Sequence, residues 1–209
     1  MDLILRLLIA FIIYGGIVGI AILAWRIIAT RRRIEEVVGT ATVVLEILVP
    51  RNNEKGPLAA ESMFASLHGI YDASKIVQEH ICFEIASKEK YILFYVRVPA
   101  HLKDFVEGQI YAQYPTVEIK EVEDYTNAAN QGDLAVAGTE LVLNHNEVFP
   151  IKTFLNFEVD PLAGITGVLS KTRDQEQVWI QVLIRPVGDE WRQKGIDYVA
   201  VGVVFFCHD

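Results

Sequence analysis

The side chains best suited to chemistry fall on two adjacent predicted strands, at 80–87 and 91–98. Alternation along the strands places an acid, a base, a thiol and two phenols on one face: Cys82, Glu84, Tyr91, Tyr95 and Arg97. One hypothesis is therefore an enzyme whose active residues, Glu84, Tyr91, Tyr95 and Arg97, converge only in three dimensions. The same rings could stack on nucleic-acid bases, or the open face could contact another protein.

The motifs that would bind a nucleotide or a metal are incomplete. Residues 164–172 resemble a phosphate loop, but Ser170 stands where a glycine must precede Lys171. His80 and Cys82 share a strand face and could supply two metal ligands, yet no further ligands follow at zinc-like spacing. We predict no catalytic residue, no metal site and no cofactor, and we expect that the chain is not an enzyme.

Composition argues against two classes of protein. After position 33 the chain holds 14 basic and 26 acidic residues, a balance of −12 that repels phosphate backbones and makes direct nucleic-acid binding unfavourable. The two cysteines, Cys82 and Cys207, are too few for a disulfide framework. We expect both to be buried thiols in a reducing compartment.

The N-terminus predicts a transmembrane helix. The run from Leu7 to Trp25 is apolar or small throughout, and its 19 residues would span about 30 Å, the hydrocarbon thickness of a bilayer. A cleaved signal peptide or a buried core helix is the alternative. Gly15 and Gly19 form a GxxxG pair that would allow a homo-oligomer through this helix.

Basic residues after this run predict its orientation. Trp25 is placed as an interfacial aromatic residue, and four arginines follow it: Arg26, Arg31, Arg32 and Arg33. Positive charge stays on the cytoplasmic side, so we expect a single-pass protein of the cell membrane. Its N-terminus would lie outside and its C-terminal region in the cytoplasm.

Residues 34–124 predict a ferredoxin-like domain within an α+β fold. Alternating apolar residues predict four strands, at 40–49, 80–87, 91–98 and 116–122. Helical spacing, bounded by proline and glycine, predicts helices after Pro57 and over 101–114. The order βαββαβ is the split βαβ arrangement, with both helices on one face of an antiparallel sheet.

A second α+β unit is predicted after a linker. The transmembrane helix and its basic flank occupy 1–33, and a polar linker occupies 125–138. Residues 139–209 then read as a similar but incomplete unit: extended segments at 140–143 and 149–155, a helix from Pro161, a strand at 177–185 and a helix start at 189–194. The last apolar run, 198–207, is either a final strand or the end of a chain cut short.

Several segments resemble one bacterial family. They are spread over most of the region after the basic flank: 46–51, 63–69, 83–85, 95–99, 110–115, 150–153 and 179–186. These segments are similar to the N-terminal region of membrane proteins of the type IV secretion or conjugative DNA-transfer ATPase family. In such proteins this region is a membrane-linked domain of unknown function, and it can precede a motor domain whose nucleotide loops this chain lacks.

The resemblance implies an anchoring or assembly role in a translocation complex. The partners that it implies are the lipid bilayer and other subunits of a membrane complex, including a translocation ATPase. The other two hypotheses are a membrane-bound enzyme, with the residues given above, and a ligand-sensing domain, which a deep apolar pocket would favour.

Overall fold

A computed structural model describes residues 11, 14–29, 31, 40–75, 77–130, 135–149, 151–173 and 176–206. The chain forms two compact units, 1–40 and 41–209, and each is described by itself. In the first unit residues 14–29 are helical and their side chains are almost all exposed.

The predicted transmembrane helix requires correction. Within the described ranges, no helix combines the length and the apolar character that crossing a membrane requires. The described helical stretch at 14–29 includes Arg26. Trp25 and Arg26 lie in that helix and Arg31 is also helical, whereas Leu7, Arg32 and Arg33 are outside the described residues, as are 8–10, 12 and 13.

The second unit begins with the six elements expected for 34–124, in the expected order. The strands and helices are β1 (Thr42–Leu48), α2 (Pro57–Leu67), β2 (Ile81–Lys88), β3 (Tyr91–Pro99), α3 (Lys103–Gln113) and β4 (Glu118–Val122). Short 3₁₀ turns extend two of them: η1 (His68–Ile70) follows α2 and η2 (Ala100–Leu102) precedes α3. Pro57 occupies the first turn of α2, where its missing N–H costs nothing.

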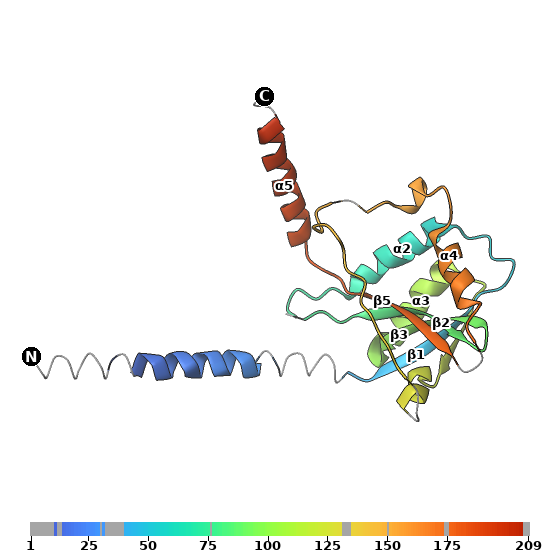
Figure 1. The fold of residues 1–209 in the computed structure, drawn as a ribbon, viewed down its shortest axis with the longest axis horizontal. Helices are drawn as coiled ribbons and strands as arrows, with labels where there is room; N and C mark the ends of the chain where they lie inside the picture. Colours follow the sequence, from blue (N-terminus) through green and yellow to red (C-terminus); the bar gives the residue numbers. More distant parts are fainter. Residues whose placement is uncertain are drawn as a thin grey trace, which may run out of the picture. The chain divides into compact units, whose positions relative to one another are not determined.

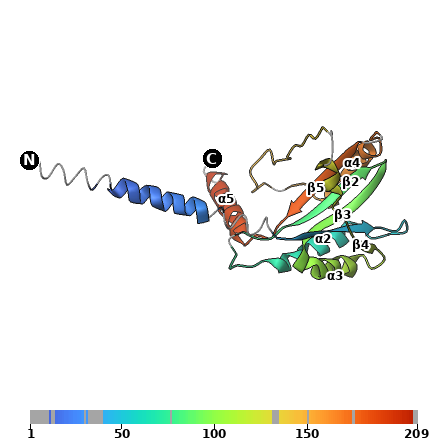
Figure 2. The same ribbon diagram turned by 90° about the horizontal axis from the view of Figure 1, so that it is seen from below.

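These strands form one antiparallel sheet in the order β4-β1-β3-β2-β5. The first four positions have the ferredoxin-like order, and the fifth strand, β5 (Gln177–Ile184), adds to β2 along its whole length, from Ile81 opposite Ile184 to Lys88 opposite Gln177. Figure 1 shows α2 and α3 together on one side of this sheet, and Figure 2 shows β5 beside β2.

The main core lies between the sheet and the helices α2 and α3. Its buried members come from both layers: Leu45, Met63, Leu67, Ile81, Val96, Val98, Val106, Ile110 and Val117. Burying one such side chain stabilises the fold by about 1.5–3 kcal/mol, so these residues fix the layer arrangement.

Among the described residues after β4, the one strand adds to the sheet of the ferredoxin-like part. That strand is β5, and the other elements there are η3 (Tyr125–Asn130), η4 (Phe154–Asn156), α4 (Pro161–Leu169) and α5 (Glu190–Phe206). The segments expected to be extended, 140–143 and 149–155, form no strand among their described residues, which are loop and part of a 3₁₀ turn. The final-strand alternative is wrong, because 198–206 continues helix α5.

Helix α4 starts as its sequence indicates. Asp160 caps it, with the Leu162 amide donating to Asp160 Oδ1 at 2.9 Å, and Pro161 fills the first turn. Its C-terminal end is held on β2, where the Ser87 hydroxyl donates to the Leu169 carbonyl at 2.8 Å. The glycines of the phosphate-loop-like segment therefore lie in the body of a helix.

Candidate functional site

The candidate chemical face lies on the side of the sheet opposite α2 and α3. At its centre is Glu84 of β2, which is only 2% exposed. Sheet register places Tyr95 of β3 on one side of Glu84 and Gln181 of β5 on the other. The strands thus place a buried carboxylate between the predicted Tyr95 and Gln181, which was not among the predicted residues.

Three donors satisfy the Glu84 carboxylate. Oε1 accepts hydrogen bonds from Arg97 Nε at 3.1 Å and Gln181 Nε2 at 3.3 Å, and Oε2 accepts one from the Tyr125 hydroxyl at 2.6 Å. A buried carboxylate is stable only with such partners. In the described part of the chain no buried side-chain polar atom lacks a hydrogen-bond partner.

Arg97 connects Glu84 to Asp124, which follows β4. The Arg97 guanidinium donates through Nη1 and Nη2 to the two oxygens of Asp124, at 2.7 and 2.9 Å. Asp124 Oδ1 also accepts from the Thr126 amide and hydroxyl, at 2.9 and 2.6 Å. The Arg97 hydrogen bond is the main cause that holds the pKa of Asp124 well below its usual range.

Aromatic rings cover this network. Tyr125 stacks on Tyr95 with ring centroids 4.7 Å apart and meets Trp179 edge-on at 5.4 Å. Burial, followed by the hydrogen bond to Glu84, raises the pKa of Tyr125 well above its ordinary value. Burial and the negative charge of Glu84 raise the pKa of the neighbouring Cys82 thiol to about 12. The thiol is therefore protonated at neutral pH.

In this geometry both oxygens of the Glu84 carboxylate are engaged in hydrogen bonds that join β2, β3, β5 and the segment after β4. The structure brings together Cys82, Glu84, Tyr95 and Arg97 as the strand pattern predicts, but Tyr91 lies at the hairpin end, 71% exposed. Sequence reasoning missed Asp124, Tyr125 and Gln181. Asp124 stands beside Glu121 and Glu123 in an acidic run, a pattern that is typical of a solvated face, whereas the structure pairs it with Arg97.

The metal-ligating residue types do not converge. His80 precedes β2 and Cys82 lies within it, and no group of three or more His, Cys, Asp or Glu side chains that could hold a metal ion occurs among the described residues. His145 pairs with the Phe149 ring and His101 bonds Glu79 Oε2 at 3.1 Å.

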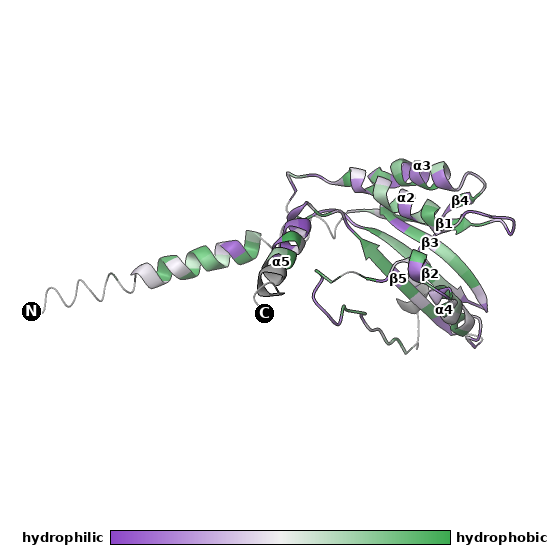
Figure 3. Cartoon of the chain, turned by 90° about the horizontal axis from the view of Figure 1, so that it is seen from above, coloured by the Kyte–Doolittle hydropathy of each residue, from purple (hydrophilic) through white to green (hydrophobic). Residues whose placement is uncertain are grey.

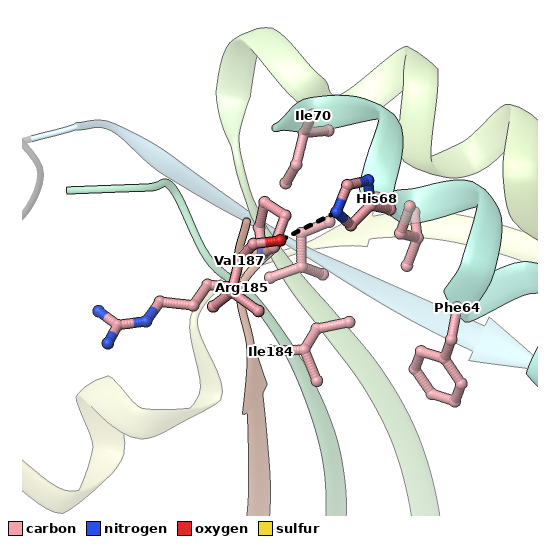
Figure 4. A pocket seen from close by; sticks show the side chains of 9 residues that line it. Phe64, His68, Ile70, Ile184, Arg185 and Val187 are labelled. Carbon is pink, nitrogen blue, oxygen red and sulfur yellow. Dashed lines mark hydrogen bonds between the residues drawn. The ribbon is translucent and has the colours of Figure 1, made fainter. Parts of the chain in front are cut away.

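An apolar pocket lies where α2 and η1 meet the end of β5. Its volume is about 260 Å³, and it is lined by Phe64, Leu67, His68, Ile70, Ile81, Ile184, Arg185, Pro186 and Val187. His68 fixes one wall by donating from Nε2 to the Val187 carbonyl at 3.1 Å (Figure 4). The Arg185 guanidinium points away from the other labelled side chains in Figure 4, so the pocket offers apolar contact.

The most distinctive surface is apolar and follows the ferredoxin-like part. Of the exposed large apolar side chains described between 40 and 199, twenty lie after position 134 and seven before it. They include Leu141, which is 93% exposed, and Val182 and Leu183 of β5, at 51% and 61%. Figure 3 shows hydrophobic residues along β5 as well as along β2 and β3.

Fold and site together define an α+β protein with a five-stranded antiparallel sheet, a buried ion-pair network and an exposed apolar surface. The family model described as Domain of unknown function (DUF8128) matches residues 29–203, so the chain belongs to that family. No curated protein and no solved structure matches the chain.

Proposed function

We propose that this chain is a non-catalytic assembly module that binds other subunits of a larger complex. The observation that carries the proposal is the exposed apolar surface after position 134, defined by its twenty large side chains. An excess of exposed apolar side chains of this kind is typical of regions that bind other proteins, because leaving apolar side chains in water is unfavourable. The polar side chains around Glu84, in contrast, bond one another: Arg97 and Tyr125 both donate hydrogen bonds to its carboxylate.

The loop at 135–149 illustrates this surface. Leu141, Val142 and Leu143 are 93%, 80% and 58% exposed, although three successive apolar residues normally find cover. The aromatic residues Phe149 and Tyr198 contact one another with centroids 5.5 Å apart, which joins the loop to α5. A partner that covers this loop would bury surface that the chain itself does not cover.

Segments such as 95–99 and 179–186 resemble the N-terminal region of type IV secretion and conjugation ATPases. This resemblance supports a translocation complex as the larger complex. The partners that we propose are therefore subunits of a translocation complex, including its ATPase. The predicted orientation at the cell membrane and the contact with a lipid bilayer rested on the transmembrane helix, and they are not part of this proposal.

Affinity purification from the native cells tests the assembly function. We expect a P-loop ATPase to be recovered with the tagged chain, and to be lost with a Leu141→Lys, Leu143→Lys double variant. Leu58→Lys, at a leucine 64% exposed on α2, is the matched control and should retain the ATPase. A monomer that recovers no partner, or recovery that is unchanged in the double variant, contradicts the proposal.

Ligand sensing is a second candidate function, favoured by the apolar pocket beside Ile184. Its volume of about 260 Å³ lies just below the ~300–1,000 Å³ of most ligand pockets. Titration with 1-anilinonaphthalene-8-sulfonate tests it: binding to this pocket should be lost in Ile184→Trp, which fills the space, and kept in Val168→Trp on α4. Equal fluorescence from both variants would exclude the pocket as the binding site.

A further inference from the structure

The two edges of the sheet differ in how they are protected. Within the described part of the chain, β4 and β5 are the outermost strands, so each has one edge without a strand partner. Natural proteins protect such edges with charged side chains, because the open backbone groups invite another strand. β4 follows this rule, with Glu118, Lys120 and Glu121 among its five residues.

β5 lacks that protection. None of its eight residues is charged: Gln177, Val178, Trp179, Ile180, Gln181, Val182, Leu183 and Ile184. It is also apolar on both faces, since Val182 and Leu183 point to opposite sides and are 51% and 61% exposed. A strand that is apolar on both faces has the composition of an interior strand, although it lies at the edge of this sheet.

We propose that β5 pairs antiparallel with β5 of a second copy of this chain, so that two five-stranded sheets become one. This inference deepens the assembly function proposed above and rests on it. Two uncharged strands place no like charges opposite each other, whereas antiparallel pairing of β4 with itself about its central residue would place Lys120 opposite the Lys120 of the second copy.

The sequence of β5 selects the register of this pairing. With the two-fold axis at Gln181, each apolar residue meets an apolar residue of the second copy: Ile180 meets Val182, Trp179 meets Leu183, and Val178 meets Ile184. An axis at Ile180 would instead place Trp179 opposite Gln181 and Leu183 opposite Gln177. Cross-strand aromatic and β-branched pairs stabilise a sheet, so the Gln181 register is favoured.

The flanks of β5 agree with this register. Glu176 precedes the strand and Arg185 follows it. Antiparallel pairing about Gln181 places Arg185 of one copy opposite Gln177 of the other, and Glu176 opposite Pro186, so no like charges meet at either end. The flanks therefore allow a second copy as the occupant of this edge.

Disulfide trapping in the full chain tests the register. In a Cys207→Ser background, Gln181→Cys places two thiols across the two-fold axis, with Cα atoms about 4.5–5.5 Å apart, within disulfide reach. Gln177→Cys is the matched control, because its two copies would be about 27 Å apart at 3.4 Å per residue. We expect at least tenfold more covalent dimer from Gln181→Cys, and equal yields would overturn the register.

Charge placed on the edge tests the interface independently. Val182→Lys should convert the dimer to a monomer in analytical ultracentrifugation, whereas Val168→Lys, at an exposed valine of α4, should not. An unchanged mass for Val182→Lys overturns the pairing. So does an intrachain disulfide in a Gln181→Cys, Leu141→Cys double variant, since the loop would then cover the edge. Recovery of an ATPase together with failure of Gln181→Cys to cross-link would leave the assembly function standing and reject this pairing alone.

Discussion

Arg97 of β3 and Asp124, which follows β4, form an ion pair with two hydrogen bonds. The Nη1–Oδ2 and Nη2–Oδ1 distances are 2.7 and 2.9 Å, and the third guanidinium nitrogen, Nε, binds Glu84. The fork of the guanidinium thus holds a carboxylate from β2 and one from the segment after β4 at the same time.

Loss of this fork should destabilise the chain. Arg97→Met leaves the buried Glu84 and the half-buried Asp124 without a cation, and we expect a loss of about 2–4 kcal/mol in the free energy of unfolding. Arg97→Lys should fall between Arg97→Met and the wild type, because an ammonium cannot bind both carboxylates in a planar fork. Urea unfolding followed by circular dichroism measures both values.

A surface ion pair supplies the control for this prediction. Lys194 and Glu147 are 3.3 Å apart, but their side chains are 66% and 62% exposed. Lys194→Met should leave the unfolding midpoint almost unchanged, since exposed pairs contribute little. If Arg97→Met is as mild as Lys194→Met, the Glu84–Arg97–Asp124 network does not stabilise the sheet.

Acid should weaken the Arg97–Asp124 pair in a defined direction. The pKa of Asp124 is lowered in the folded chain, mainly by the Arg97 hydrogen bond, while an unfolded aspartate titrates near about 3.9. Its stabilising contribution is therefore complete above about pH 4 and is lost as the pH falls towards the folded pKa. The stability gap between wild type and Asp124→Asn should narrow from pH 5 to pH 2, as thermal unfolding at each pH would show, and a constant gap would contradict it.

The strands of this network could be predicted from sequence, but its closing residues could not. Alternation alone places Glu84 and Arg97 on one face. Asp124 reaches Arg97 because Val44 of β1 pairs with Arg97 on one side and with Val122 on the other. That relation depends on the β4-β1-β3 order of the sheet, which has no local signal along the chain.

The region after β4 shows where short apolar patterns fail. The run at 198–206 contains valines and phenylalanines that suit a strand, yet it continues the helix that begins at Glu190. A short apolar run fits either state, and the preceding helical turn decides. β5 was predicted correctly as a strand, but its place beside β2 is a long-range pairing that periodicity cannot indicate.

Cys82 should be unreactive in the folded chain. Its pKa is raised to about 12, by burial first and then by Glu84, so roughly one thiol in ten thousand is ionised at pH 8. In a Cys207→Ser background, Ellman's reagent at pH 8 should label Cys82 at least a hundredfold more slowly than in the same chain unfolded in urea. Rapid labelling of the folded chain would show that the face around Glu84 opens readily.

The turn of the β2–β3 hairpin is formed by Glu89 and Lys90, two residues that disfavour the left-handed backbone conformation found there. Glu89 and Lys90 have φ values of 51° and 69°, and among the described residues they are the non-glycine positions with positive φ. Two-residue hairpin turns of this hand favour Asn-Gly, because other side chains crowd the backbone in the left-handed region.

Replacing the turn should therefore stabilise the fold. Glu89→Asn with Lys90→Gly removes the left-handed strain, and we expect a gain of about 1 kcal/mol in the free energy of unfolding by urea titration. Lys55→Gly is the control, because it adds a glycine to a loop where φ is not positive, and it should be neutral or destabilising. A loss of stability in the double variant would show that the turn depends on contacts of the Glu89 or Lys90 side chains, and not on backbone conformation.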